Sequence, residues 1–98
     1  MLRSRSKPMT KDDAESLALQ VLAFLLADPN QTSRFLSLTG LSPDDLRGVA
    51  SSRELQTATF DYILSDEGLL LSFCQEAGID PAIVGPAHQL LTGPIDFS

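Results

Sequence analysis

The sequence predicts an all-α fold, a compact bundle of five or six short helices. No stretch of the 98 residues alternates polar and apolar side chains over the length that a strand needs. Apolar residues recur instead at helical spacing. In addition, residues that typically begin and end helices, an Asp or Ser before Pro and an isolated Gly, divide the chain into helix-sized segments. We therefore expect no sheet.

The same pattern of helix boundaries occurs twice, at an offset of 38 residues. Phe24-Leu25-Leu26-Ala27-Asp28 aligns with Tyr62-Ile63-Leu64-Ser65-Asp66, and the alignment continues without a gap. The identical pairs are Leu26/Leu64, Asp28/Asp66, Phe35/Phe73, Gly40/Gly78 and Pro43/Pro81. A period of this size defines a building unit. Either the fold consists of two pseudo-repeated three-helix units, or two unrelated helix pairs share the same cap residues. Both interpretations predict the same local structure.

The length of the chain suffices for one domain, which we expect over residues 10–92. Residues 1–9 are expected to be a disordered basic arm, and residues 93–98 a C-terminal tail. Because no predicted core residue precedes Leu17, removal of residues 1–11 is expected to leave the fold intact.

The first helix is expected over residues 11–27, with Thr10 as its N-cap. One helical stripe is formed by Leu17, Ala18, Val21, Phe24 and Leu25. Leu19, Leu22 and Leu26 fill the other side. Apolar residues on both sides predict a central helix that the others surround.

The second helix begins at Asp28-Pro29-Asn30-Gln31, which combines an N-cap, Pro at the first helical position and Gln at the third. It is expected to end at Gly40, with Leu41 as the hydrophobic partner of that C-cap. Ser42-Pro43-Asp44-Asp45 opens a short third helix, which Gly48 weakens.

Three further helices complete the predicted bundle. Ser51-Ser52-Arg53-Glu54 fits a capping box at the start of a fourth helix. Ser65 or Asp66 caps a fifth, which Gly78 ends. Asp80-Pro81 begins a sixth, and Gly93-Pro94 stops it.

Charge is distributed unevenly along the chain. The first eleven residues carry four cations (Arg3, Arg5, Lys7 and Lys11), whereas the remainder has three arginines against thirteen acids, a net charge of −10. The apolar run at residues 17–27 lacks a cleavage site and is too short to span a membrane. A single cysteine excludes an intrachain disulfide. We expect a cytoplasmic protein with no membrane association.

Few residues are candidates for catalysis. His88, the only histidine, lies beside the apolar stripe of the last helix, and no carboxylates stand at metal-ligand spacing from it. Cys74 is expected to be an inert core thiol. The acidic groups Asp12/Asp13/Glu15, Asp44/Asp45 and Asp66/Glu67 fall at predicted helix starts, where the helix dipole accounts for them. We expect no enzyme, no metal and no cofactor. The rival hypothesis is a small enzyme that uses His88 with a carboxylate brought close by the fold.

Residues 36–49 have the Gly and apolar spacing of a helix-turn-helix DNA reader. The second helix would then open with Asp44 and Asp45, whose carboxylates repel phosphates. Nucleic-acid binding, through this segment and the basic arm, is therefore the less favoured alternative. Any such binding is expected at low salt only, and to depend on residues 1–11.

Four segments resemble a family of small all-helical alphaproteobacterial proteins catalogued only as a domain of unknown function. They are Ala23-Phe24-Leu25-Leu26-Ala27-Asp28, Arg34-Phe35-Leu36, Thr39-Gly40-Leu41-Ser42-Pro43-Asp44-Asp45-Leu46-Arg47 and Ala77-Gly78-Ile79. The resemblance covers residues 14–91. It implies a helical fold and supplies no activity and no site residues.

The favoured function is a protein–protein interaction module or a homodimer. Several apolar residues lie in excess of the main stripes: Leu38, Phe60, Leu64, Leu69, Leu70 and Leu71. A small domain that cannot bury all of them keeps an apolar patch, and such patches mark partner sites. The identity of the partner, another protein or a second copy, does not follow from the sequence.

Overall fold

The computed structural model describes residues 9–92, and within them the all-α prediction is confirmed. Five α-helices and two 3₁₀ helices follow one another along this part of the chain. They are α1 (Lys11–Leu26), α2 (Pro29–Thr39), η1 (Pro43–Ser51), α3 (Arg53–Leu64), α4 (Glu67–Ala77), η2 (Pro81–Ile83) and α5 (Val84–Thr92). The breaks fall where the cap residues predict them. The predicted arm, except Met9, and the predicted tail lie outside the described residues.

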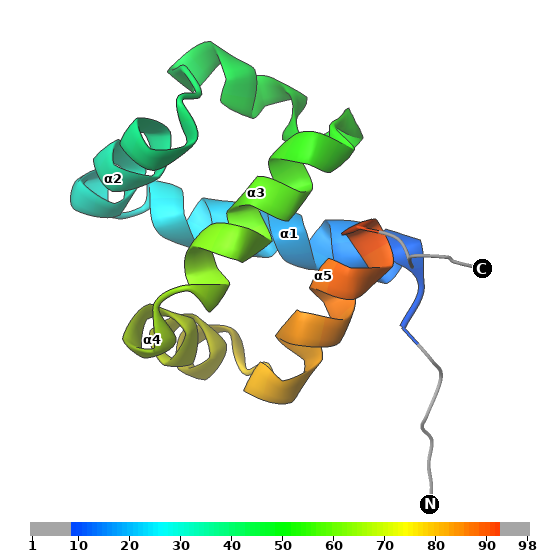
Figure 1. The fold of residues 1–98 in the computed structure, drawn as a ribbon. Helices are drawn as coiled ribbons and strands as arrows, with labels where there is room; N and C mark the ends of the chain where they lie inside the picture. The colour runs from blue at the N-terminus through cyan, green and yellow to red at the C-terminus, as the bar shows by residue number, and fades with distance from the viewer. Residues whose placement is uncertain (1–8, 93–98) are drawn as a thin grey trace, which may run out of the picture.

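Helices α1 and α3 cross at the centre of the bundle (Figure 1). Helix α5 packs against both of them. In the view of Figure 1, α2 and η1 lie on one side of this centre, and α4 and η2 lie on the other. The two outer segments therefore flank a three-helix centre.

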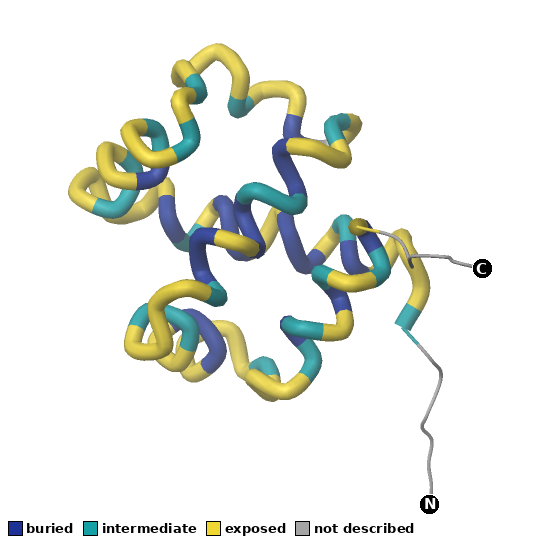
Figure 2. The backbone as a smooth tube through the Cα atoms, viewed as in Figure 1, coloured by how far each residue is buried: buried dark blue, intermediate teal, exposed yellow. Residues whose placement is uncertain are grey.

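The buried residues follow this arrangement (Figure 2). Most of them lie on α1, α3 and α5, whereas α2 contributes Phe35 and α4 contributes Phe73 and Cys74. Phe35, Phe60 and Ile63 are completely inaccessible to solvent. Each outer helix thus attaches to the centre through an aromatic ring on one face.

The prediction that the other helices surround α1 is wrong on one face. Leu22 is buried, but Leu19 and Leu26 remain 38% and 42% exposed. The described helices pack against α1 from the side of Leu17, Val21 and Leu25. The opposite face of α1 stays open to solvent.

The start of α1 contributes more to the core than the sequence predicts. Ala14 is fully buried, Met9 packs against the core cluster, and Thr10 caps α1 through a reciprocal pair of hydrogen bonds with Asp13. Removal of residues 1–11 would therefore delete a core contact and an N-cap. A cut after residue 8 avoids both.

The caps of the outer helices match the sequence closely. Asp28 and Asp66 accept hydrogen bonds from the backbone of α2 and α4. Gly40 and Gly78 end these helices at φ values of 75° and 70°, a conformation that favours glycine because it has no Cβ. Gln31, at the third position of α2, accepts a hydrogen bond from the Tyr62 hydroxyl, which the sequence did not predict.

The third and fourth helices also depart in detail from the prediction. The third is a 3₁₀ helix, η1, rather than an α-helix. Gly48 costs about 1 kcal/mol within an α-helix, and the 3₁₀ form covers more distance per residue between α2 and α3. The α3 N-cap is Ser52, which accepts from the Leu55 N–H, rather than Ser51 in a capping box with Glu54.

The 38-residue offset is reproduced element by element. Helix α2 spans 29–39 and α4 spans 67–77, and η1 and η2 begin at Pro43 and Pro81. Beyond this point the two halves differ, because η1 stays 3₁₀ to Ser51, whereas η2 gives way to α5 after three residues.

Two aromatic contacts relate the halves to each other. Phe35 on α2 meets Tyr62 on α3 with ring centroids 5.4 Å apart, and Phe73 on α4 meets Phe24 on α1 at the same distance. Adding or subtracting 38 converts one pair into the other. The outer helix of each half therefore contacts the central helix of the opposite half, as a pseudo-two-fold arrangement requires.

Candidate functional site

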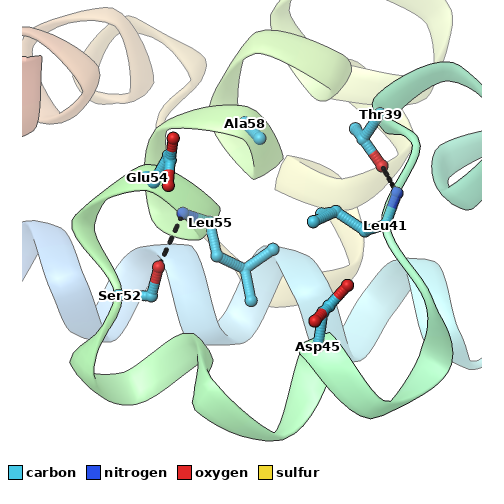
Figure 3. A pocket seen from close by; sticks show the side chains of 7 residues that line it. All are labelled: Thr39, Leu41, Asp45, Ser52, Glu54, Leu55 and Ala58. Atoms are coloured by element: carbon cyan, nitrogen blue, oxygen red, sulfur yellow. Dashed lines mark hydrogen bonds between the residues drawn. The ribbon is translucent and has the colours of Figure 1, made fainter.

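A shallow depression of about 270 Å³ lies between the end of α2 and the middle of α3. It is lined by Leu38, Thr39, Ala58, Asp61, Tyr62 and Ser65. Through Thr39 and Ala58 it adjoins a second hollow of about 350 Å³ between η1 and the start of α3. The second hollow is also lined by Leu41, Asp45, Ser52, Glu54 and Leu55 (Figure 3). We call the two together the α2/α3 groove.

The turn after α2 shapes this groove. Gly40 in the left-handed conformation reverses the chain, so that Leu41 points toward Leu55 (Figure 3). The Thr39 hydroxyl fixes the turn, because it donates to the Phe35 carbonyl at 2.7 Å and accepts from the Leu41 N–H at 3.3 Å. Hydrogen bonds between the Thr39 side chain and the backbone therefore hold the turn that carries Leu41.

The groove carries negative charge only. Its lining residues include the exposed acids Asp45, Glu54 and Asp61 and no Lys, Arg or His. Asp45 Oδ2 accepts hydrogen bonds from the backbone N–H and hydroxyl of Ser42, so this carboxylate is fixed in orientation. The electrostatic field at the groove favours a cationic ligand.

A second depression, of about 330 Å³, lies between α1 and α4. We call it the α1/α4 depression. It is lined by Gln20, Ala23, Phe24, Ala27, Phe73, Glu76 and Ala77. Its walls are mainly small apolar residues, and Glu76 is its one acid; no cation lines it. The exposed Leu26 lies on α1 beside Ala27 in the sequence.

The two depressions between outer and central helices occupy equivalent positions in the two halves. An offset of 38 relates six residues of one to six of the other: Gln20/Ala58, Ala23/Asp61, Phe24/Tyr62, Ala27/Ser65, Glu76/Leu38 and Ala77/Thr39. The surfaces that α2 and α4 contribute to the two depressions differ in composition. The shared geometry therefore comes from the backbone arrangement, and the side chains vary on it.

His88 approaches Asp61 at the edge of the α2/α3 groove. Nε2 lies 2.8 Å from Asp61 Oδ1, an ion pair when the ring is protonated, and this nitrogen is shielded from solvent. The ring also contacts Phe60 edge-on at 6.1 Å. Asp61 is 69% exposed. The fold thus brings the single histidine to one carboxylate and joins α5 to α3 there.

Cys74 is buried on the inner face of α4, 3% exposed. Burial, with a smaller contribution from the Asp80 carboxylate, raises the pKa of its thiol above the ordinary value of 9.0. Both effects disfavour the thiolate, which is the reactive form. This environment is that of a packing residue.

The six residues singled out by sequence as candidates for partner binding separate into three groups. Leu38 and Leu71 are exposed, at 70% and 47%. Leu64, Leu69 and Leu70 are partly buried against the core. Phe60 is completely buried and contributes no surface. Of this set, Leu38 lines the α2/α3 groove, and the other five line neither the groove nor the α1/α4 depression.

Two exposed leucines of α1 and the acids of the two depressions escape sequence reasoning, although each leaves a signal. Leu19 and Leu26 are seven residues apart, so they share a face of α1 that the main stripe does not use. Asp61 and Glu76 lie near helix C-termini, where the dipole disfavours acids. An acid in that position needs another explanation, and this signal could have drawn attention to both.

Among residues 9–92, no helix is long and apolar enough to cross a membrane. No group of three or more His, Cys, Asp or Glu side chains in the same range could hold a metal ion.

A family model described as "Protein of unknown function (DUF3572)" matches residues 11–94. The match extends beyond the predicted resemblance by three residues at each end. Neither a curated protein nor a solved structure matches the chain.

Proposed function

We propose that this chain, which belongs to the family described as Protein of unknown function (DUF3572), is a protein–protein interaction module. The observation that supports the proposal is the α2/α3 groove, where an exposed leucine and an apolar floor adjoin three carboxylates. Leu38 is 70% exposed at its edge. A large apolar side chain held in water beside a depression favours burial by a partner.

The shape of the groove favours a macromolecular partner over a small molecule. Small-molecule sites enclose most of their ligand in a deep cleft, whereas the two hollows here are shallow and open to solvent along α3. A helix laid in a groove needs such an elongated, open surface. Since Cys74 is the only cysteine and needs no oxidising compartment, we place the protein and its partner in the cytoplasm.

Capture from the native cell extract tests the proposal. The baits are the natural chain, Ala58→Trp, which fills the groove without a change of charge, and Ser72→Trp, an equal substitution on the exposed face of α4. We expect a nuclease-resistant protein that the natural chain and Ser72→Trp capture equally and that Ala58→Trp captures in a smaller amount. Equal capture by all three baits would contradict the use of this groove.

Self-association is the second form of the same proposal. Sedimentation of the purified chain at rising concentration distinguishes it from binding of another protein. A dimer that dissociates on Leu38→Ser would identify the partner as a second copy. A monomer at every concentration would leave another protein as the partner.

Catalysis by His88 is the alternative that a specific contact favours, because Asp61 lies 2.8 Å from its ring. A His–carboxylate pair orients a base, but covalent catalysis also requires a nucleophile within reach. Within residues 9–92, the side-chain contacts recorded for His88 are Asp61 and the Phe60 ring. We therefore assign the pair a structural role. Loss of a measured turnover in His88→Ala, with stability retained, would contradict this assignment.

Nucleic-acid binding has less support. The segment expected to read DNA is the 3₁₀ helix η1, which opens with exposed Asp44 and Asp45. Sequence-selective DNA binding by a chain that lacks residues 1–8 would contradict our preference for protein binding over nucleic-acid binding.

A further inference from the structure

We infer that the α2/α3 groove and the α1/α4 depression bind two copies of one kind of segment. The segment is helical and carries an apolar side chain with a lysine or arginine beside it on the same face. This inference rests on the proposed function and adds the chemistry of the partner and the number of segments bound per chain.

The apolar part of the segment follows from the floors of the two depressions. Tyr62 forms one floor and Phe24 the other, and each ring is held edge-on by a buried phenylalanine 5.4 Å away. Small neighbours, such as Ala58 in one and Ala23 in the other, leave room above the ring. A rigid aromatic floor with small walls fits an inserted aliphatic or aromatic side chain.

The basic part of the segment follows from charge. Each depression has an exposed acid in its lining, Asp61 in one and Glu76 in the other, and neither is lined by a cation. After Arg53 the chain has no Lys or Arg, although His88 Nε2 lies 2.8 Å from Asp61 Oδ1 and pairs with that acid when its ring is protonated. Asp45 and Glu54 add two further carboxylates to the α2/α3 groove. An acidic segment would be repelled at both places.

The number of segments follows from the internal symmetry. Equivalent positions line both depressions, so a segment that fits one backbone frame meets the same frame in the other. The side chains differ, with Leu38 and Asp61 standing where Glu76 and Ala23 stand in the other half. We therefore expect two binding events of the same class with unequal affinities.

A defined peptide pair provides the probe. One peptide is an amphipathic helix of leucine and lysine, with leucine at three- and four-residue spacing. Its control replaces every lysine by glutamate. Binding is followed by calorimetry for stoichiometry and by amide chemical shifts for location. We expect two leucine–lysine peptides per chain, shifts at both depressions, weaker binding at higher salt, and no binding of the leucine–glutamate peptide.

Matched variants assign each binding event to its depression. Ala58→Trp and Gln20→Trp fill equivalent positions on α3 and α1, and Ser72→Trp is the control. Each filling variant should reduce the stoichiometry from two to one, and the double variant should abolish binding. If a tryptophan variant fails to fold, Glu54→Gln in the α2/α3 groove and Glu76→Gln in the α1/α4 depression replace it. Each should weaken its own event about two- to fivefold, the value of an exposed ion pair.

Three results would overturn the inference. The first is binding at one depression only, which would leave the proposed function in place. The second is equal peptide binding by the natural chain and the double variant, which would indicate general attraction to the acidic surface. The third is peptide binding only after removal of residues 1–8, which would make the chain's own Arg3, Arg5 and Lys7 the occupant. The proposed function itself fails only if Ala58→Trp also leaves the amount of captured native partner unchanged.

Discussion

Tyr62 joins the two halves of the chain through its contact with Phe35. The rings meet edge-on at 5.4 Å with an interplanar angle of 82°, and the Tyr62 hydroxyl donates to Gln31 Oε1 at 2.7 Å. Phe24 occupies the equivalent place in the first half and meets Phe73 at an angle of 67°. Each outer helix packs against the central helix of its own half and reaches the central helix of the opposite half through one aromatic pair. Tyr62 and Phe24, one ring of each pair, line the two depressions.

Removal of the Tyr62 hydroxyl should distinguish the free-energy contribution of its hydrogen bond from that of the ring contact. We expect Tyr62→Phe to cost about 1 kcal/mol of unfolding free energy, the net value of one hydrogen bond. Phe35→Ala should cost about 3–5 kcal/mol, because it opens a cavity in the core. Urea unfolding measures both. A double-mutant cycle between positions 35 and 62 should give a coupling of about 0.5–1.5 kcal/mol, and zero coupling would contradict the contact.

The buried amide of Gln56 should stabilise the end of η1. Its Nε2 donates to the Val49 carbonyl at 2.8 Å, and the residue is 1% exposed. Gln56→Leu leaves that carbonyl without this donor, so we expect a loss of about 1–3 kcal/mol. Hydrogen exchange should accelerate in η1 before it does in α5. Uniform acceleration across the chain would indicate a general packing defect instead.

Alanine should destabilise the protein at the glycines that end α2 and α4, but not at the glycine within η1. Gly40 and Gly78 have positive φ, so Ala at either position should cost about 1 kcal/mol. Gly48 has negative φ, and a Cβ added there meets nothing within 4 Å. Gly48→Ala should be neutral or stabilising by up to about 1 kcal/mol. Thermal unfolding of the three variants tests this order, and a loss at Gly48 would contradict it.

The Cys74 thiol should make stability depend on pH in the alkaline range. Burial raises its pKa in the folded state, so the unfolded chain loses the thiol proton first as pH rises. The contribution of the neutral thiol is complete below the ordinary thiol pKa and is lost as pH rises through the raised folded value. Urea midpoints between pH 7 and pH 10 should therefore fall more steeply for the natural chain than for Cys74→Ala. Parallel curves for the natural chain and Cys74→Ala would show that folding does not raise the pKa of the thiol.

Local structure was largely predictable because it depends on residues that act close in sequence. Asp28 and Asp66 cap the helices that follow them, and Gly40 and Gly78 end those helices. The 3₁₀ form of η1 was not predictable, because it depends on the distance that the chain must cover between α2 and α3. Phe60 was predicted to belong to a partner surface because it lies off the main stripes, but α5 covers that side of α3 and buries it.

The candidate site was mostly hidden from sequence reasoning for the same reason. The groove forms where Leu38, Asp61 and Tyr62 meet, and they come from two helices that are separated by η1. The sequence supplies the offset of 38 residues but not the crossing of the two halves. Only the arrangement in space shows that the repeat produces two equivalent depressions.

Ring-to-ring nuclear Overhauser effects in the full-length chain test the crossed arrangement most directly. The chain has five phenylalanines, one tyrosine and no tryptophan, so its aromatic signals are few enough to assign individually. We expect contacts between Phe35 and Tyr62 and between Phe73 and Phe24. Contacts of Phe35 with Phe24 and of Phe73 with Tyr62, without the crossed pairs, would contradict the arrangement on which both depressions depend.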